Sequence, residues 1–303
     1  MSAVSIAADV QNALDGGRPV VALESAVITH GLPKPAAIDA VKRQVDACRS
    51  AGSEPAVVAV FDGLLRVGLS LDECRRLSEH PDAVKVSPWN LGAALVTPGF
   101  GGTTVAATIV AAARAGIHVM STGGIGGVHP GNNGQDVSAD LTELSRCPVC
   151  VVCAGPKSTL DAAATMERLE TLGVPVIGWR SSILAGFLAT SAGLRVPLRA
   201  DAIAMLASTV RQHWALGGAG IIVSQPLSGD HAIPRSELEQ AHDEALSVRG
   251  PQRTPAELRA LQARLGERVI AANIALLERN AALAGSLALA LVGDRTHVAK
   301  RDG

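Results

Sequence analysis

An acidic residue, Glu24, directly follows the uninterrupted apolar run VVAL at residues 20–23. A run of this kind is typical of a parallel strand that is buried on both faces. A carboxylate just after its last residue would lie at the carboxyl edge of the sheet, where open α/β sheets bind their ligands. Glu24 is therefore either a structural group that bonds a neighbouring loop or an acid that acts on a ligand.

Two lysines stand in similarly unusual places. Lys85 lies inside the short apolar segment AVKVS at residues 83–87, and Lys157 lies between the apolar run VVC and a helical pattern. The second position is again a carboxyl edge of the sheet, beside the start of a helix. Lysines are most often solvated surface residues, but an amine held at such an edge is a candidate Schiff-base nucleophile.

Two glycine-rich segments, residues 99–104 (GFGGTT) and 121–129 (STGGIGGVH), accompany expected strand or helix ends. The second is not a dinucleotide fingerprint, because His129 stands where the third glycine of G-x-G-x-x-G is required, and no Gly-Lys-Ser/Thr of a Walker loop occurs. Free N–H groups and hydroxyls in such segments suit one small anion, such as a phosphate. Ordinary glycine turns without a ligand are the alternative.

Asp136, Ser138 and Asp140 follow closely in the segment QDVSADL. Asp136 or Ser138 would cap a helix over residues 140–145, with Asp140 favourable in its first turn. The functional alternative is a polar or hard-cation site. Because carboxylates are few here, water would supply most ligands of such a cation.

Asn273 and Asn280 are seven residues apart in a long helix expected over residues 267–291, which places them two turns apart on one face. Their neighbours on the helix are apolar, so both amides are expected to be buried. A buried amide needs a partner. Each therefore either bonds the backbone of a loop or contributes its amide to a pocket.

The segment CPVCVVC at residues 147–153 resembles part of an iron–sulfur ligand pattern, but the expected fourth cysteine is missing. Residues 149–153 are predicted to form a buried strand, in which Cys150 and Cys153 face opposite sides of the sheet. We therefore expect buried thiols that act as small apolar residues rather than as metal ligands.

Strand-like and helix-like segments alternate through the first three quarters of the chain, which predicts a layered α/β fold with a largely parallel sheet. After Ser224 helices dominate, and Thr254-Pro255 is expected to begin one of them. One domain spanning residues 1–303, with a helical C-terminal section, is the prediction. The expected strands are 20–24, 56–61, 84–87, 117–121, 149–153, 174–178 and 220–224, and helices are expected over 36–49, 71–79, 104–114 and 158–172.

Composition excludes several classes of function. The chain has 303 residues, three Phe, three Trp, no Tyr and a net charge of −1. Platforms for stacking bases are scarce and no basic run occurs, so we expect no nucleic-acid polymer as partner. The longest apolar run, residues 281–293, is too short to span a bilayer, and the first residues have no secretory-signal pattern. An odd number of cysteines, five, indicates a reducing cytoplasm.

In order and spacing, the motifs resemble those of the pseudouridine-5′-phosphate glycosidases, also called indigoidine synthase A-like proteins. The resemblance runs over nearly the whole chain and is therefore more specific than any single glycine loop. It rests on VVALESAVITHGLP, VKVS, GGTTVAAT, STGGIGGVH, DVSADLTEL, VVCAGPKSTLD and NIALLERNA.

The resemblance implies a cytoplasmic lyase of nucleotide catabolism that reversibly splits the C–C glycosidic bond of pseudouridine 5′-phosphate into uracil and ribose 5-phosphate. It implies a homotrimer whose subunit is a three-layer α/β/α sandwich, and a Mn²⁺ or another divalent cation at Asp136. Glu24 would be the acid that opens the ribose ring, and Lys157 the nucleophile that forms an imine with C1′. The implied substrate contacts are Lys85, Val105, Thr122, Gly123, His129, Ser138, Ala139, Asp140 and Asn280.

The implied chemistry agrees with the residues found. A C–C glycosidic bond has no leaving heteroatom to protonate, so hydrolysis by paired carboxylates is poorly suited to it. An opened sugar and an amine form an iminium, an electron sink that supports cleavage. The alternatives are a Schiff-base lyase for another sugar phosphate or C-nucleotide, and a catalytically silent sugar-phosphate-binding protein.

The sequence departs from the family pattern in three places. Residues 88–92 (PWNLG) and 130–134 (PGNNG) differ from the expected loops, and Arg279 stands before Asn280 where another Asn is expected. These positions bear on loop conformation and base contacts more than on Lys157.

Overall fold

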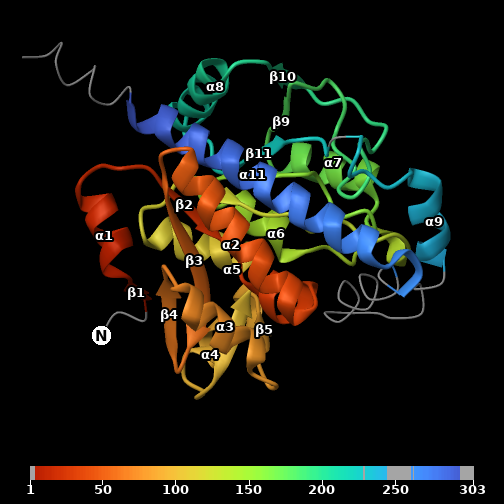
Figure 1. Ribbon diagram of the computed structural model, residues 1–303. Helices are drawn as coiled ribbons and strands as arrows, with labels where there is room; N and C mark the ends of the chain where they lie inside the picture. The colour runs from red at the N-terminus through yellow and green to blue at the C-terminus, as the bar shows by residue number, and fades with distance from the viewer. Residues whose placement is uncertain (1–3, 228, 244–260, 262, 294–303) are drawn as a thin grey trace, which may run out of the picture.

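The protein is described by a computed structural model that covers residues 4–227, 229–243, 261 and 263–293 (Figure 1). Its centre is a sheet in the order β1-β4-β3-β2-β7-β8-β11-β9-β10, with β6 alongside β3 and β5 alongside β6. The strands are β1 (Val4–Ile6), β2 (Val20–Leu23), β3 (Glu54–Phe61), β4 (Leu64–Val67), β5 (Val84–Val86), β6 (Phe100–Thr103), β7 (Val119–Ser121), β8 (Cys150–Cys153), β9 (Val176–Trp179), β10 (Leu198–Ala200) and β11 (Ile221–Ser224).

Among the described strands, every pairing is parallel except those of β3 with β4 and with β6. The antiparallel hairpin between β3 and β4 turns at Asp62-Gly63, both with positive φ. An Asp-Gly pair favours a tight hairpin turn. The largely parallel mixed sheet predicted from the sequence is therefore confirmed.

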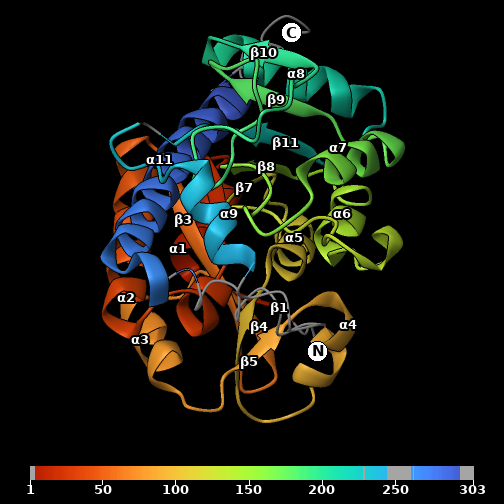
Figure 2. The same cartoon turned by 90° about the vertical axis from the view of Figure 1, so that its right-hand side faces the viewer.

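Helices cover both faces of the sheet, which confirms three layers. Alternate residues of β3 enter two separate cores: Val58 and Val60 pack with one set of helices, and Val57 and Ala59 with the other. Figure 2 shows α2 and α11 on one side of the strands and α5, α6 and α7 on the other. The first face carries α2 (Lys34–Ser50), α3 (Leu71–Glu79), α8 (Ile203–Ala215) and α11 (Glu267–Gly293); the second carries α1 (Ala8–Asp15), α5 (Val105–Arg114), α6 (Ala139–Leu144) and α7 (Ala162–Thr171).

Shorter elements complete the described fold: α4 (Pro88–Ala94), α9 (Arg235–Asp243), the π-helix η1 (Val27–Gly31) and the 3-10 turn η2 (Asn132–Gly134). The capping box predicted at Ser70 and Glu73 is present, and α3 has the predicted bounds. The predicted helix start at Thr254-Pro255 lies outside the described residues.

Two sequence expectations are corrected. The predicted helix over 158–172 begins only at Ala162, because the Asp161 side chain accepts a hydrogen bond from the Ala164 N–H and caps the helix there. The predicted anion loop over residues 99–104 is largely the strand β6, paired with β3 and β5. The glycines of this segment suggested a loop. Phe100–Thr103 nevertheless form a strand, because their backbone pairs with β3 on one side and with β5 on the other.

The predicted burial of Cys150 and Cys153 on opposite faces of one strand is confirmed. Cys150 belongs to the core on one face of the sheet and Cys153 to the core on the other. Burial raises the pKa of the Cys153 thiol to about 12, so it stays protonated near neutral pH.

One described helix, α11, is long and apolar enough to cross a membrane, with a mean hydropathy of 1.4 in its most apolar window. It packs along α2 (Figure 1), and half of that window is buried inside the protein. Its residues Leu276, Ala284 and Leu287 are core residues. α11 therefore has the position of a core helix of a globular protein.

Gly285 sets the close approach of α11 to the end of α2. A Cβ added there would lie 2.7 Å from Ala51 Cβ and 2.8 Å from Ser53 Oγ, whereas a Cβ at the helical Gly92 would meet nothing within 4 Å. We expect Gly285→Ala to lower the free energy of unfolding by ~1–2 kcal/mol, as overpacking outweighs the better helix propensity of alanine. Gly92→Ala, the control, should raise it by up to ~1 kcal/mol. Urea unfolding of both variants checks this, and equal shifts in one direction would contradict it.

Candidate active site

A cavity of about 740 Å³ brings together most of the residues singled out from the sequence. Glu24 follows β2, Lys85 lies in β5 and Lys157 follows β8, so three strands deliver them to one place. The predicted site residues that line this cavity are Glu24, Lys85, Val105, His129, Asp136, Ser138, Ala139, Asp140 and Lys157.

A smaller cavity of about 60 Å³ adjoins the large one. Glu24, His30, Lys85 and Lys157 line both cavities, and Gly123 lines the smaller one. The acid and the two amines therefore stand where the two cavities meet.

Glu24 is 8% exposed, and its carboxyl accepts a hydrogen bond from Thr122 Oγ1. The pairing of β2 with β7 places Leu23 opposite Ser121, so Glu24 and Thr122 leave adjacent strands together. Burial raises the pKa of Glu24, while the Lys157 charge and the Thr122 hydrogen bond act in the opposite direction. The net effect is a carboxyl that keeps its proton to higher pH than an exposed glutamate, as a general acid requires.

Lys85 is held by the pairing of β5 with β6, in which it lies opposite Gly102. Burial lowers the pKa of Lys85, and the nearby positive charge of Lys157 lowers it further, against the carboxylates of Asp140 and Glu24. The two amines are therefore close enough to sense each other's charge.

The divergent segment PWNLG forms α4 at the rim of the large cavity. Asn90 caps this helix by accepting a hydrogen bond from the Ser87 N–H, and its Nδ2 donates to the Lys85 carbonyl at 3.1 Å. Trp89 and Asn90 both line the cavity. The departure from the family pattern is thus a structured wall that fixes the end of β5.

Asp140 joins two backbone segments of the site. Its buried carboxylate accepts hydrogen bonds from the Ala106 N–H at 2.9 Å and from the Gly126 N–H at 2.7 Å. Ser138 caps α6, as the structural alternative predicted, and its Oγ accepts from the Asp140 N–H at 3.2 Å. The Ala106 N–H at the start of α5 is already bonded to Asp140. That helix end therefore has fewer free N–H groups for a phosphate than the sequence suggested.

The two asparagines of α11 have different roles. Asn280 is 1% exposed, and its Nδ2 donates to the Thr122 carbonyl at 2.8 Å, so it holds the turn that carries Thr122 and Gly123. Neither Asn280 nor Thr122 is among the residues that line the cavities described above, whereas Asn273 lines the smaller one. Asn273 therefore lines a cavity and Asn280 bonds loop backbone, while the substrate contact implied for Asn280 stays a prediction.

Sequence reasoning missed two residues, His30 and Phe187. His30 lies on the π-helix η1, with Nδ1 2.6 Å from Thr29 Oγ1, and lines both cavities. Single π-helical turns are frequent at functional sites. The motif THGLP could have indicated His30. Nothing in the sequence indicated Phe187, because the residues around it form no recognisable motif.

A divalent cation was expected at Asp136. Asp136 is half-buried and lines the large cavity, but in the part of the chain that the structure describes no three His, Cys, Asp or Glu side chains gather as ligands. One carboxylate and nearby hydroxyl oxygens are hard ligands, which suit a cation that keeps most of its water. The residues therefore fit a hydrated cation rather than an all-protein cage.

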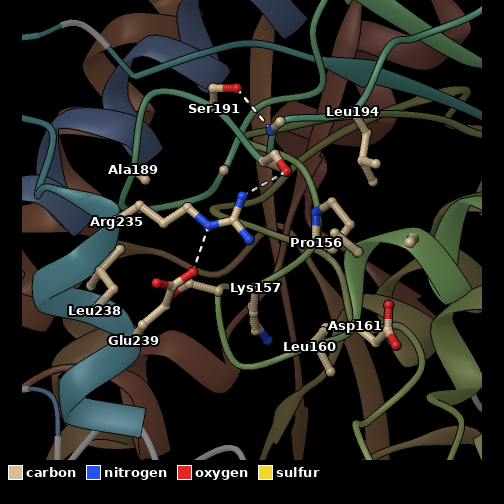
Figure 3. A pocket seen from close by; sticks show the side chains of 16 residues that line it. Pro156, Lys157, Leu160, Asp161, Ala189, Ser191, Leu194, Arg235, Leu238 and Glu239 are labelled. Atoms are coloured by element: carbon tan, nitrogen blue, oxygen red, sulfur yellow. Dashed lines mark hydrogen bonds and ion pairs between the residues drawn. The ribbon is translucent and has the colours of Figure 1, made fainter.

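A third cavity, of about 380 Å³, lies along the Lys157 segment and beneath α9 (Figure 3). Lys157 and Arg235 both line it, and Arg235 donates from Nε to Glu239 Oε1 at 2.8 Å and from Nη1 to the Ala192 carbonyl at 3.2 Å. Because Glu239 offsets the Arg235 charge and Lys157 also lines the large cavity, a phosphate is better matched by the large cavity, where Lys85 is a second amine.

Known proteins are similar to this chain over nearly its whole length. A sequence profile described as indigoidine synthase A like protein matches residues 9–290. The pseudouridine-5′-phosphate glycosidase of Dinoroseobacter shibae is 43% identical over 299 residues, covering 96% of this chain and 98% of its own. The enzyme of the same name from Roseiflexus sp. is 44% identical over 301 residues, covering 96% of each chain.

Two solved structures have the same fold. One is the prealnumycin C-glycosynthase AlnA in complex with ribulose 5-phosphate, with a TM-score of 0.88 and 35% identity over 97% of this chain and 98% of its own. The other is an indigoidine synthase A-like protein from Thermotoga maritima, with a TM-score of 0.88 and 34% identity over 95% and 96% of the two chains.

The raised pKa of Glu24 predicts a pH-dependent stability effect. A carboxyl whose folded-state pKa lies above its unfolded value stabilises the fold at low pH and loses that contribution as pH rises through the folded value. Glu24→Gln stays neutral throughout. Its melting temperature should exceed that of the wild type at pH 8, and the gap should shrink at pH 4. Glu167→Gln, at an exposed position of α7, is the control for thermal unfolding. A difference in melting temperature between Glu24→Gln and the wild type that does not change with pH would refute the raised pKa of Glu24.

Proposed function

The chain belongs to the indigoidine synthase A-like family, and we propose on that premise that it reversibly cleaves pseudouridine 5′-phosphate to uracil and ribose 5-phosphate. The observation that carries the proposal is the meeting of Glu24, Lys85 and Lys157 at the junction of two cavities. Relatives over the full chain are named for this activity. A buried acid beside two amines is the set of groups that cleavage through an imine requires.

In the proposed mechanism Glu24 donates its proton to the ribose ring oxygen, and the bond between that oxygen and C1′ breaks. The nitrogen lone pair of Lys157 then adds to C1′. When uracil C5 takes up a proton, the C1′–C5 bond breaks, the nitrogen lone pair forms the imine, and the bond electrons restore the C5–C6 double bond. Water hydrolyses the imine and releases ribose 5-phosphate, so the net reaction consumes one water.

Lys85 assists from the side of the sugar phosphate. Its side chain lines the large cavity together with that of Lys157, and the lowered pKa of Lys85 reflects burial and that neighbour. Phosphate held by an ammonium is a charge-assisted contact. Lys85 therefore anchors and orients the substrate in this proposal, while Lys157 reacts.

A second candidate is C–C bond formation between a pentose 5-phosphate and a different carbon nucleophile. The observation that favours it is the fold and 35% identity shared with AlnA, a C-glycosynthase whose structure contains ribulose 5-phosphate. Glu24 and Lys157 would serve the same imine in the reverse direction. A silent sugar-phosphate-binding protein is less favoured, because binding alone needs neither a buried acid nor a second amine.

Trapping of the imine tests the nucleophile. Borohydride added with ribose 5-phosphate should convert Lys157 to a secondary amine that resists trypsin, leaving one peptide, Cys147–Arg168, with the added sugar mass. Lys157→Ala should abolish the adduct, while Lys34→Ala, an exposed lysine of α2, should retain it. An adduct on Lys85 would reverse the two lysine roles. No adduct, with an aldolase reacting in parallel, would remove the imine mechanism and leave the binding protein as the leading candidate.

We also propose that Asp136 holds a Mn²⁺ or another divalent cation, with water as most of the remaining ligands. When bound, the cation would neutralise negative charge in the large cavity. Asp136→Asn should weaken Mn²⁺ binding in calorimetric titrations by about tenfold or more, whereas Asp9→Asn on α1 should leave it unchanged. Equal affinity in the wild type and Asp136→Asn would place the cation elsewhere. A homotrimer and a cytoplasmic location remain part of the same proposal.

A further inference from the structure

Lys157 lines all three cavities described above: the large one, the smaller one and the third one beneath α9. Glu24 and Lys85 line the first two but not the third. A substrate that reacts with both Glu24 and Lys157 must therefore occupy the junction of the large and the smaller cavity. The third cavity reaches the lysine without the acid, so it suits a reactant that needs Lys157 alone.

The charges around the third cavity are balanced. Its charged lining residues are two basic and two acidic ones: Lys157, Arg235, Asp161 and Glu239. Arg235 is held in place, because it bonds both Glu239 and the Ala192 carbonyl. A neutral small molecule therefore meets no excess of either charge in this cavity, whereas an anion such as a sugar phosphate meets two carboxylates.

The third cavity has both the room and the polar partners that water needs. Its volume is about 380 Å³, many times the roughly 30 Å³ that one water molecule takes up in the liquid. Ser158 lines the cavity, and its Oγ is buried without a hydrogen-bond partner within the described residues. The next residue, Thr159, is 6% exposed, and its Oγ1 also has no partner in the part of the chain that the structure describes. Ordered water commonly satisfies buried hydroxyls of this kind.

Small side chains form the outer wall of the third cavity. Ala162 and Ala163 at the start of α7 both line it, and Ala163 is exposed to solvent. Figure 3 shows Lys157 between Asp161, which caps α7, and Glu239 of α9. The cavity therefore reaches from the surface to the lysine, and substitutions on α7 can narrow it while Lys157 itself is unchanged.

We propose that the third cavity is the route by which water reaches the imine on Lys157. In this step the water oxygen adds to C1′ and the bond between C1′ and the Lys157 nitrogen breaks. The nitrogen keeps the electrons of that bond and receives the two water protons, so the amine and the aldehyde of ribose 5-phosphate are restored. The inference rests on the proposed imine mechanism. It lets water approach Lys157 while the sugar phosphate still fills the junction of the other two cavities.

Filling the third cavity tests the route. In Ala162→Phe the first turnover should release one uracil per enzyme at the wild-type rate, because the proposed cleavage needs no water before the imine stage. Later turnovers should slow ~10-fold, since access of water then limits kcat. Borohydride added during turnover should trap a larger share of the enzyme on Lys157. Ala164→Phe lines none of the three cavities and is the matched control, which should behave like the wild type in each measurement.

A second variant, Ala163→Phe, repeats the test at an exposed position, where substitutions rarely unfold a protein. Unchanged steady-state turnover in both variants overturns the proposal. Slower turnover without additional trapped imine also overturns it, because a step other than hydrolysis has then slowed.

Ribose 5-phosphate alone separates this proposal from the proposed function. Imine formed from labelled ribose 5-phosphate and chased with an excess of the unlabelled compound should decay ~10-fold more slowly in Ala162→Phe than in the wild type. A wild type that forms this imine but cleaves no pseudouridine 5′-phosphate overturns the activity, and the chase still decides the route of water. Equal decay in the variant and in a wild type that cleaves the nucleotide overturns only the route. A wild type that forms no imine overturns both.

Discussion

The buried carboxyl of Glu24 is the constraint on which the arrangement of the site depends. Burial of an ionisable group is costly unless it is hydrogen-bonded or paired. Here one strand delivers the carboxyl, the adjacent strand delivers the Thr122 hydroxyl that bonds it, and the next strand in the sheet leads to Lys157. A parallel sheet is suited to this task, since it brings the ends of sequence-distant strands to one edge. The raised pKa of Glu24 shows that the supporting groups offset burial only in part, and an acid needs that imbalance.

A second layer of side chains fixes the backbone around these groups. Asn280 holds the carbonyl of Thr122, and Asp140 ties the start of α5 to the loop at Gly126. Gly126 has no room for a side chain, because a Cβ would lie 2.2 Å from Ser138 Oγ. These contacts pack the glycine segment closely against the start of α5 and the residue that caps α6. Close packing holds backbone groups in place, and catalysis requires reacting groups to be held within narrow limits.

The sequence predicted the parts of the site that local pattern controls. Glu24 and Lys157 were found because buried parallel strands read as apolar runs, so a polar residue at the end of such a run stands out. The strand β6 was not found, because its glycines read as a loop and only its two neighbouring strands make it part of the sheet. Likewise, spacing put Asn273 and Asn280 on one helix face but could not say which amide meets a cavity. That choice depends on where the Thr122 turn lies against α11, which is a tertiary fact.

The division of the site into a polar and an apolar half has a consequence for how such enzymes change substrate. In the proposed mechanism the imine needs only the sugar phosphate, an acid and an amine, and Glu24, Lys85 and Lys157 meet at the junction of the cavities. The apolar walls of the smaller cavity come from Phe187 and α11. Relatives that match nearly the whole chain are named as a glycosidase and, with the same fold, as a C-glycosynthase. One arrangement of acid and amines would serve both activities, because the proposed imine forms on the sugar phosphate in each.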